Sequence, residues 1–246
     1  MRRAILSLTL PVLLLAGASH AGAGGLDLRI GAFFPSACHS TPCKSSSLNQ
    51  DLNDLYTPNA DPNRGVEGSD FTGVFGGVEY SAVIAPNIEL GLHLDAFGHT
   101  VHSSYRDYER PSGGEIMQDL ELDTVPLGAT IRLVPTGKRT RFAPYIGGGI
   151  DAVFYSYEER GDFIDFYDPT YPILPDAFKD DGVAFGVHGV AGIRYYVNHD
   201  FAIVAEGRYL WAKKDMGEDL APNESGLVNT IDLSGWSATV GVHVRF

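Results

Sequence analysis

The last eleven residues of the chain, 236–246, alternate without a break between apolar side chains and polar or small ones. Successive side chains of a β-strand point to opposite faces of its sheet, so the pattern predicts a strand with one apolar and one polar face. Such a long alternation that ends the chain on an aromatic residue is typical of the closing strand of a transmembrane β-barrel. The predicted outward row consists of Trp236, Ala238, Val240, Val242, Val244 and Phe246.

The start of the chain predicts export. Two arginines follow Met1, and an apolar run extends from Ala4 to Ala18. The run is shorter than the roughly 17 to 25 residues of a membrane-spanning helix. Small residues at Ser19-His-Ala21 then predict a signal peptide over residues 1–21, with cleavage after residue 23 as the alternative. The remaining chain has no long apolar stretch, so a protein that stays in a membrane would cross it as strands.

Composition narrows the class of partner. The formal charge of −13 becomes −15 once the two arginines of the signal peptide are removed, which argues against nucleic acid. The 29 glycines, 12 tyrosines and 13 phenylalanines suit a single all-β domain over residues 24–246.

Cys38 and Cys43 lie five apart in a polar segment of an exported chain, which predicts a small disulfide loop. A zinc site that adds His39 is the weaker alternative, because no second cysteine pair accompanies them.

The alternation of the last strand recurs seven times. The first, second and third of these segments lie near 26–34, 74–80 and 88–96, and the others near 125–133, 145–155, 183–197 and 201–211. In the fourth, Leu120 and Leu122 are out of phase with the apolar row that begins at Val125, which predicts either a bulge near Thr124 or an exit from the membrane. We therefore expect an eight-stranded antiparallel up-and-down transmembrane β-barrel.

The connections alternate between long and short. Long polar segments lie near 35–70, 102–119, 158–181 and 213–229, and tight turns lie at 85–87, 135–141 and 198–200. Bacterial outer-membrane barrels have short periplasmic turns and long external loops, whereas a soluble β-sandwich, the alternative, needs no such alternation. Aromatic residues toward the strand ends fit the girdles of such a barrel: Tyr80, Phe142, Phe154, Tyr195, Phe201, Tyr209 and Trp211.

The signal peptide, the eight strands, the alternating connections and the terminal row that ends on Phe246 together resemble one family. These features are similar to the small bacterial outer-membrane barrels typified by the OmpA membrane domain, OmpX and OmpW. The resemblance is one of pattern and carries no motif of a subfamily. It implies that the β-barrel assembly machinery reads the terminal row, Trp236, Val240, Val242, Val244 and Phe246, as the insertion signal. It implies no activity.

The predicted inward faces carry a nearly balanced set of charges. A barrel of eight strands has room inside only for side chains or one small ligand, so these charges must be paired or hydrated. We therefore expect a network of salt bridges that plugs the lumen. The alternative is a narrow polar conduit or a proton-sensitive gate, with His93, His188 and His243 as titrating groups. The set consists of Asp27, Arg29, Glu79, Glu89, Asp95, Arg132, Asp151, Arg194, Glu206, Arg208 and Arg245.

Two other activities have weaker support. His102, Ser103 and Ser104, with Glu109 or Glu115, offer the residue types of a lipid A deacylase, but Tyr105-Arg106 replaces the Asn-Ala that follows the serine in that class. The acidic loops are compatible with divalent ions that bridge to lipopolysaccharide. Within the first loop, Asn59 to Gly65 is similar to a calcium-binding loop but lacks its leading Asp.

The sequence thus favours a barrel without enzymatic activity, catalytic residues, cofactor or metal, located in the bacterial outer membrane. A structural or surface-interaction role is the first hypothesis, and a narrow channel for small or apolar solutes, as OmpW-like proteins imply, is the second. The expected partners are outer-membrane lipid, lipopolysaccharide and, during insertion, the assembly machinery. We expect a monomer.

Overall fold

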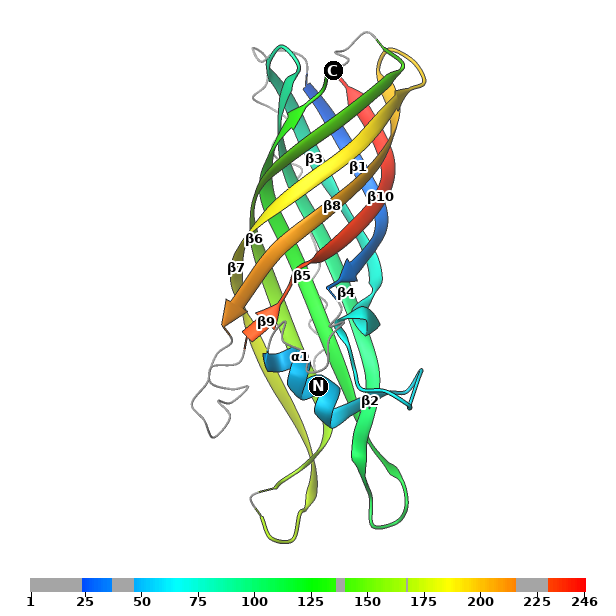
Figure 1. The fold of residues 1–246 in the computed structure, drawn as a ribbon, viewed down its shortest axis with the longest axis vertical. Coiled ribbons are helices and arrows are strands. Elements are labelled where there is room, and N and C mark those ends of the chain that lie inside the picture. Colours follow the sequence, from blue (N-terminus) through cyan, green and yellow to red (C-terminus); the bar gives the residue numbers. More distant parts are fainter. Residues whose placement is uncertain (1–23, 37–46, 136–139, 167, 216–229) are drawn as a thin grey trace, which may run out of the picture.

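The computed structural model describes residues 24–36, 47–135, 140–166, 168–215 and 230–246 (Figure 1). The predicted signal peptide and the predicted disulfide between Cys38 and Cys43 lie outside these residues. No helix among the described residues is long and apolar enough to cross a membrane. Almost all of the described chain consists of antiparallel strands.

Eight strands form a closed barrel. They are β1 (Gly24–Pro35), β3 (Gly73–Ala85), β4 (Ile88–Glu109), β5 (Glu115–Leu133), β6 (Phe142–Ile164), β7 (Ile173–Tyr196), β8 (Phe201–Asp215) and β10 (Gly235–Arg245). Each strand pairs with the strands next to it in this order, and β10 closes the ring by pairing with both β8 and β1. The register of β10 on β1 runs from Gly235 opposite Pro35 to Arg245 opposite Gly25. The all-β, eight-stranded prediction is confirmed.

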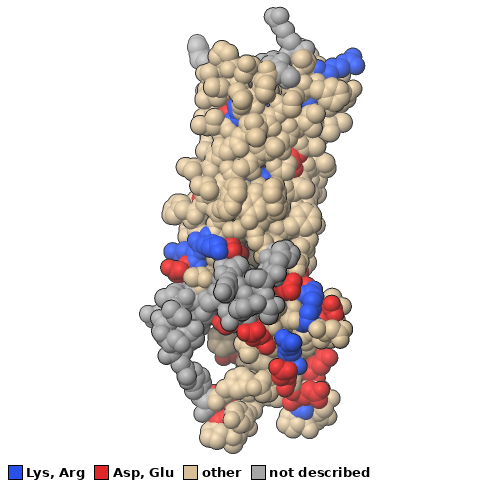
Figure 2. Space-filling view, viewed as in Figure 1, with Lys and Arg blue, Asp and Glu red and all other residues tan. Residues whose placement is uncertain are grey.

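The wall of the barrel is apolar on its outside, as the alternation predicts. Ile30, Ile150 and Phe185 are 62%, 66% and 80% exposed, although they lie in the middle of paired strands. Figure 2 shows this wall as a band almost free of charged side chains. Exposed apolar residues all round a closed sheet are explained by lipid as the surrounding medium.

Aromatic rings lie at both ends of this apolar wall. Tyr80 lies 6.2 Å from Phe246, and Phe142 lies 4.9 Å from Tyr195, near the end with the short turns. At the other end, Tyr209 packs against Trp211 and Trp236, at ring distances of 4.4 and 4.9 Å. These are the two aromatic girdles expected at the lipid–water boundaries.

Two hairpins extend well past the wall at the end opposite the short turns (Figure 1). The strands β4 to β7 have 22, 19, 23 and 24 residues, whereas about 9 to 11 suffice to cross a membrane. The segments predicted as loops at 102–119 and 158–181 are therefore mostly strand, and their turns lie near 110–114 and 165–172.

The inward row of β5 runs without a bulge from Ile116 to Arg132, so Leu120 and Leu122 point into the barrel. The apparent change of phase at these two leucines had two predicted explanations, a bulge near Thr124 or an exit of the strand from the membrane. The bulge is wrong. The outward residues of β5 are mostly acidic from Asp123 back to Glu115, which marks the exit of the strand from the lipid.

The described part of the segment between β1 and β3, residues 47–71, covers the mouth of the barrel at this end (Figure 1). It contains α1 (Ser47–Leu55), β2 (Tyr56–Pro58) and a 3-10 helix, η1 (Gly68–Phe71), and β2 pairs with β4. A short strand, β9 (Thr230–Asp232), pairs with the end of β8. Leu52, Val66 and Phe71 are buried against the inward apolar residues of the barrel. The mouth is therefore covered by a packed cap.

Candidate functional site in the barrel lumen

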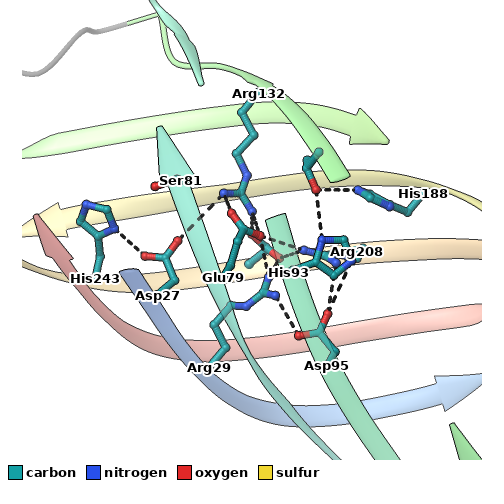
Figure 3. Close-up of polar contacts among 12 residues, drawn as sticks. Asp27, Arg29, Glu79, Ser81, His93, Asp95, Arg132, His188, Arg208 and His243 are labelled. Atoms are coloured by element: carbon teal, nitrogen blue, oxygen red, sulfur yellow. Dashed lines mark hydrogen bonds and ion pairs between the residues drawn. The ribbon is translucent and has the colours of Figure 1, made fainter. Parts of the chain in front are cut away.

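Arginines and carboxylates from five of the eight strands meet in the middle of the lumen (Figure 3). Arg132 on β5 forms a two-pronged ion pair with Glu79 on β3 and also reaches Glu206 on β8, at 2.9 Å. Arg29 on β1 pairs with Glu206 and, at 2.9 Å, with Asp95 on β4. Each arginine thus links several strands, and none of these side chains is more than 7% exposed.

One of these ion pairs spans the full width of the barrel. Arg208 on β8 lies 3.2 Å from Asp95 on β4, and these two strands are separated by four steps around the ring of eight. Arg132 and Asp27 are also separated widely around the ring, and their charged atoms are 4.0 Å apart. Charged groups from opposite walls meet only if the side chains cross the axis of the lumen. The network therefore occupies the centre of the barrel at this level.

A second group of charges lies nearer the short turns. Arg194 on β7 pairs with Glu89 at 2.6 Å and with Asp27 at 3.1 Å, and His243 Nδ1 lies 2.5 Å from Asp27. Tyr145 links the two groups, since its hydroxyl donates to Glu206 at 2.8 Å and its ring lies 5.1 Å from the Arg194 guanidinium. The predicted balance of charge inside the barrel is thus realised as a connected network.

Ten of the eleven residues predicted for the inward charge set are in ion pairs inside the barrel. Arg245 is the exception, and its assignment to the network is wrong. Its guanidinium lies over the ring of Tyr196, 4.3 Å from the centroid, at the end of the last strand. This position is close to the water at the membrane boundary, so the charge does not need a buried partner.

A third group consists of Asp151 on β6, His93 on β4 and His188 on β7. His93 Nε2 lies 2.8 Å from one oxygen of Asp151, and His188 Nδ1 lies 2.6 Å from the other. Thr130 on β5 contacts the second nitrogen of both rings, at 3.4 Å for His93 and 2.9 Å for His188. The alternation of the strands predicts inward positions for both histidines, but it does not indicate that they share one carboxylate.

Beyond these polar groups, the lumen is filled by apolar side chains. Phe33 contacts Phe97 at a ring distance of 5.1 Å, and Leu120 and Val153 are completely buried. The apolar cluster continues to the cap over the mouth. A cavity of about 20 Å³ remains beside Asp95, Asp151 and Arg208, with room for about one water molecule.

A buried carboxyl group lies under the cap, outside the lipid. Glu159 accepts hydrogen bonds from Tyr157, at 2.9 Å, and from Tyr56 of β2, at 3.4 Å. Among the described residues no cation pairs with it. Burial raises the pKa of Glu159 above its ordinary value near 4.5, against the opposing effect of the two tyrosine hydroxyls, and Asp51 on α1 raises it further.

The residue types of a deacylase do not assemble as predicted. His102 Nδ1 lies 2.6 Å from Asp119, across the β4–β5 pair, and not beside Glu109 or Glu115, which face each other at the tip of the hairpin. Ser103 donates to the carbonyl of Gln118, and Ser104 is buried where β2 pairs with β4. In the loop that is similar to a calcium site, Arg64 lies 3.4 Å from Asp61, so a cationic side chain already faces this carboxylate.

The family of outer membrane protein β-barrel domains matches residues 8–246. The chain belongs to this family. This membership and the lipid-facing wall place the protein in the bacterial outer membrane. A search of the curated proteins finds no match.

Solved structures with a similar fold are small outer-membrane barrels. Neisserial surface protein A is 14% identical, with a TM-score of 0.45 over 92% of this chain and 98% of its own. Outer membrane protein W of E. coli is 15% identical, with a TM-score of 0.45 over the same shares. A major outer membrane protein of Thermus thermophilus is 12% identical, with a TM-score of 0.46 over 91% of this chain and 99% of its own.

Proposed function

We propose that the protein is a closed outer-membrane barrel without enzymatic activity, whose role is structural or lies in surface interactions. The contact that carries this proposal is the one between Arg208 and Asp95 on opposite walls. Breaking a buried ion pair by withdrawing one partner costs about 3–5 kcal/mol, so the crossing pairs would not open for a passing solute. The apolar residues and the cap add a second barrier toward the outside.

The parts that remain available for interaction are the outer wall and the external sheet. The wall contacts lipid, and lipopolysaccharide is the lipid whose phosphates would meet the exposed His102 and Lys214. The external parts of β4 to β7 and the cap carry most of the exposed charge, as Figure 2 shows. A surface role would therefore depend on this sheet, and the barrel would hold it in place as a monomer.

Planar-bilayer recording tests the closed lumen against the second hypothesis, a narrow channel. The purified protein should give no steady unitary current. Thr124 points inward beside the cavity and Asp123 points outward beyond the lipid, so Thr124→Trp is the lumen-filling variant and Asp123→Trp is its control. Steady currents of the wild type that persist in D123W and disappear in T124W would overturn the proposal. Silence of the wild type would support it, whereas currents that neither variant changes would show that the current does not pass through this lumen.

Lipid A analysis tests the proposed absence of enzymatic activity. We expect the mass of lipid A to be the same in cells that express the wild type, His102→Ala or no protein. The physical reason is that the exposed imidazole of His102 is paired with Asp119, while Ser104 is buried. A change in lipid A mass with the wild type that H102A abolishes would establish a hydrolase.

A further inference from the structure

Asp151 differs from the other carboxylates of the lumen because no arginine of the described chain pairs with it. Among the described residues, its ion-pair partners are His93 and His188. The described network holds six carboxylates, Asp27, Glu79, Glu89, Asp95, Asp151 and Glu206, and four arginines, Arg29, Arg132, Arg194 and Arg208. A buried carboxylate requires compensation, and here the two imidazoles or a cation between them must supply it.

The strand register places glycines around this group. One row across the sheet reads His93, Gly128, Asp151 and Gly186, and the neighbouring row reads Gly91, Thr130, Gly149 and His188. Each functional side chain therefore lies beside a residue without a side chain. A Cβ atom added at Gly128 would clash with Asp151 and lie 2.7 Å from His93 Nε2, and one at Gly149 would lie 2.7 Å from His188 Cε1. The glycines open a space that the three ligating groups face.

We propose that His93, His188 and Asp151 bind a transition-metal dication of the Zn²⁺ class inside the barrel. One ligand atom from each of the three side chains lies within 4.8 Å of the other two. Atoms bound tetrahedrally at about 2.0–2.1 Å from one ion lie about 3.4 Å apart, so small rotations of the side chains complete the site. Two imidazoles favour Zn²⁺ over Ca²⁺ or Mg²⁺, which take oxygen ligands.

The surroundings supply the remaining parts of such a site. The hydroxyl of Thr130 contacts the ring nitrogens of both histidines that point away from Asp151, which fixes the rings with the ligating nitrogens toward the carboxylate. The cavity of about 20 Å³ borders Asp151 and holds about one water, the usual fourth ligand of an open zinc site. The ion would also neutralise the charge of Asp151, so binding would be linked to folding.

Metal analysis of the folded protein tests the proposal. The background carries Cys38→Ser and Cys43→Ser, so that the thiols do not contribute. The protein is unfolded in urea with a chelator, refolded into detergent with ZnCl2, freed of loose metal and checked for the mobility of a folded barrel. We expect about one zinc per folded chain, and a thermal unfolding midpoint that rises with the zinc concentration.

Matched variants distinguish zinc that is bound at this site from zinc that is bound by other histidines. His93→Gln and His188→Gln should each lose the bound zinc, whereas His243→Gln should keep it, because His243 also faces a buried carboxylate, Asp27, but without a second histidine. Thr130→Val removes no ligand and should weaken zinc binding by about 10- to 100-fold. Folded wild type that retains no zinc would overturn the proposal, and so would equal zinc in H93Q, H188Q and H243Q. Folded wild type without zinc would mean that a protonated imidazole balances the negative charge of Asp151.

Discussion

At the scale of single residues, the lumen shows how a small barrel holds charge away from water. Arg132 forms ion pairs with three carboxylates, those of Glu79, Glu206 and, at 4.0 Å, Asp27, and its side chain is completely buried. The inward position of these residues follows from the alternation of each strand. The alternation does not show which of these residues form ion pairs. Arg132 and Glu206 lie on strands that are three steps apart around the ring, so their contact depends on the tilt and stagger of all strands together.

Removal of Arg132 should therefore be costly. Arg132→Ala leaves Glu79 and Glu206 with fewer cationic partners and should lower the free energy of unfolding by about 3–5 kcal/mol. Urea unfolding in detergent, followed by tryptophan fluorescence, measures the change. Arg160→Ala is the control, because this arginine is exposed and pairs with Glu158 on the surface, and it should cost at most about 1 kcal/mol. Equal midpoints for both variants would contradict a stabilising network.

Glu159 makes the stability of the capped mouth depend on pH. Its pKa in the folded protein is raised by burial, so ionisation is less favourable in the folded than in the unfolded state. Below the ordinary value near 4.5 this residue imposes no penalty. Stability is lost as the pH rises from there through the raised pKa of the folded state, and above that pKa it changes no further. The unfolding midpoint of the wild type should thus be higher at pH 5 than at pH 7.

Glu159→Gln should remove most of this dependence and stabilise the protein at pH 7, because the amide carries no charge. Its oxygen can still accept from Tyr157, and its NH2 group can donate to the hydroxyl oxygen of Tyr56. Glu158→Gln, the neighbouring residue on the outward face, serves as the control and should leave the pH profile unchanged. The comparison uses thermal unfolding at both pH values. If E159Q kept the wild-type profile, another group would be responsible.

At the scale of strands, the two-residue period predicted which face of each strand is outward, but not where the strands end. Within the lipid, apolar residues point outward, and beyond it they point inward while polar residues meet water. Leu120 and Leu122 lie beyond the lipid, where apolar side chains point inward. Their apparent change of phase therefore reflects the change from lipid to water around the strand. The outer parts of β4 to β7 were predicted as loops for the same reason, since their outward residues are polar.

The last strand should be sensitive to charge on its lipid face. Val242 is 46% exposed to lipid and is paired on both sides, with Leu28 and Ile203. Val242→Asp and Phe246→Asp should impair insertion and spare export, because an ionised side chain on the lipid face is costly. Fractionation of cells measures the protein in the periplasm and in the outer membrane.

Met117→Asp is the matched control for these variants. Met117 is also outward and 48% exposed, but it lies on β5 beyond the lipid boundary marked by Asp123. Its replacement should leave the level in the outer membrane unchanged. Normal outer-membrane levels of V242D and F246D, or an equal loss with M117D, would contradict a specific role of the terminal row.

At the scale of the whole molecule, two barriers of the proposed closed lumen lie in series along the barrel axis. The cap from the segment between β1 and β3 packs on apolar residues at the outer mouth, and the charge network crosses the lumen nearer the short turns. The sequence predicted only the network. The cap was not predictable from periodicity, since α1 and η1 are short and β2 has three residues.

Deletion of the cap separates the two barriers. A variant that lacks residues 37–71, with a short Gly-Ser linker in their place, should still fold, because the eight barrel strands and their register are untouched. It should also remain silent in planar bilayers, because Arg208, Arg132 and their partners on opposite walls still fill the lumen. The mobility of the folded band in gels without heating confirms that the tested sample is a barrel. Steady unitary currents from this variant would mean that the cap alone closes the barrel, and that the charged groups leave a path through which ions pass.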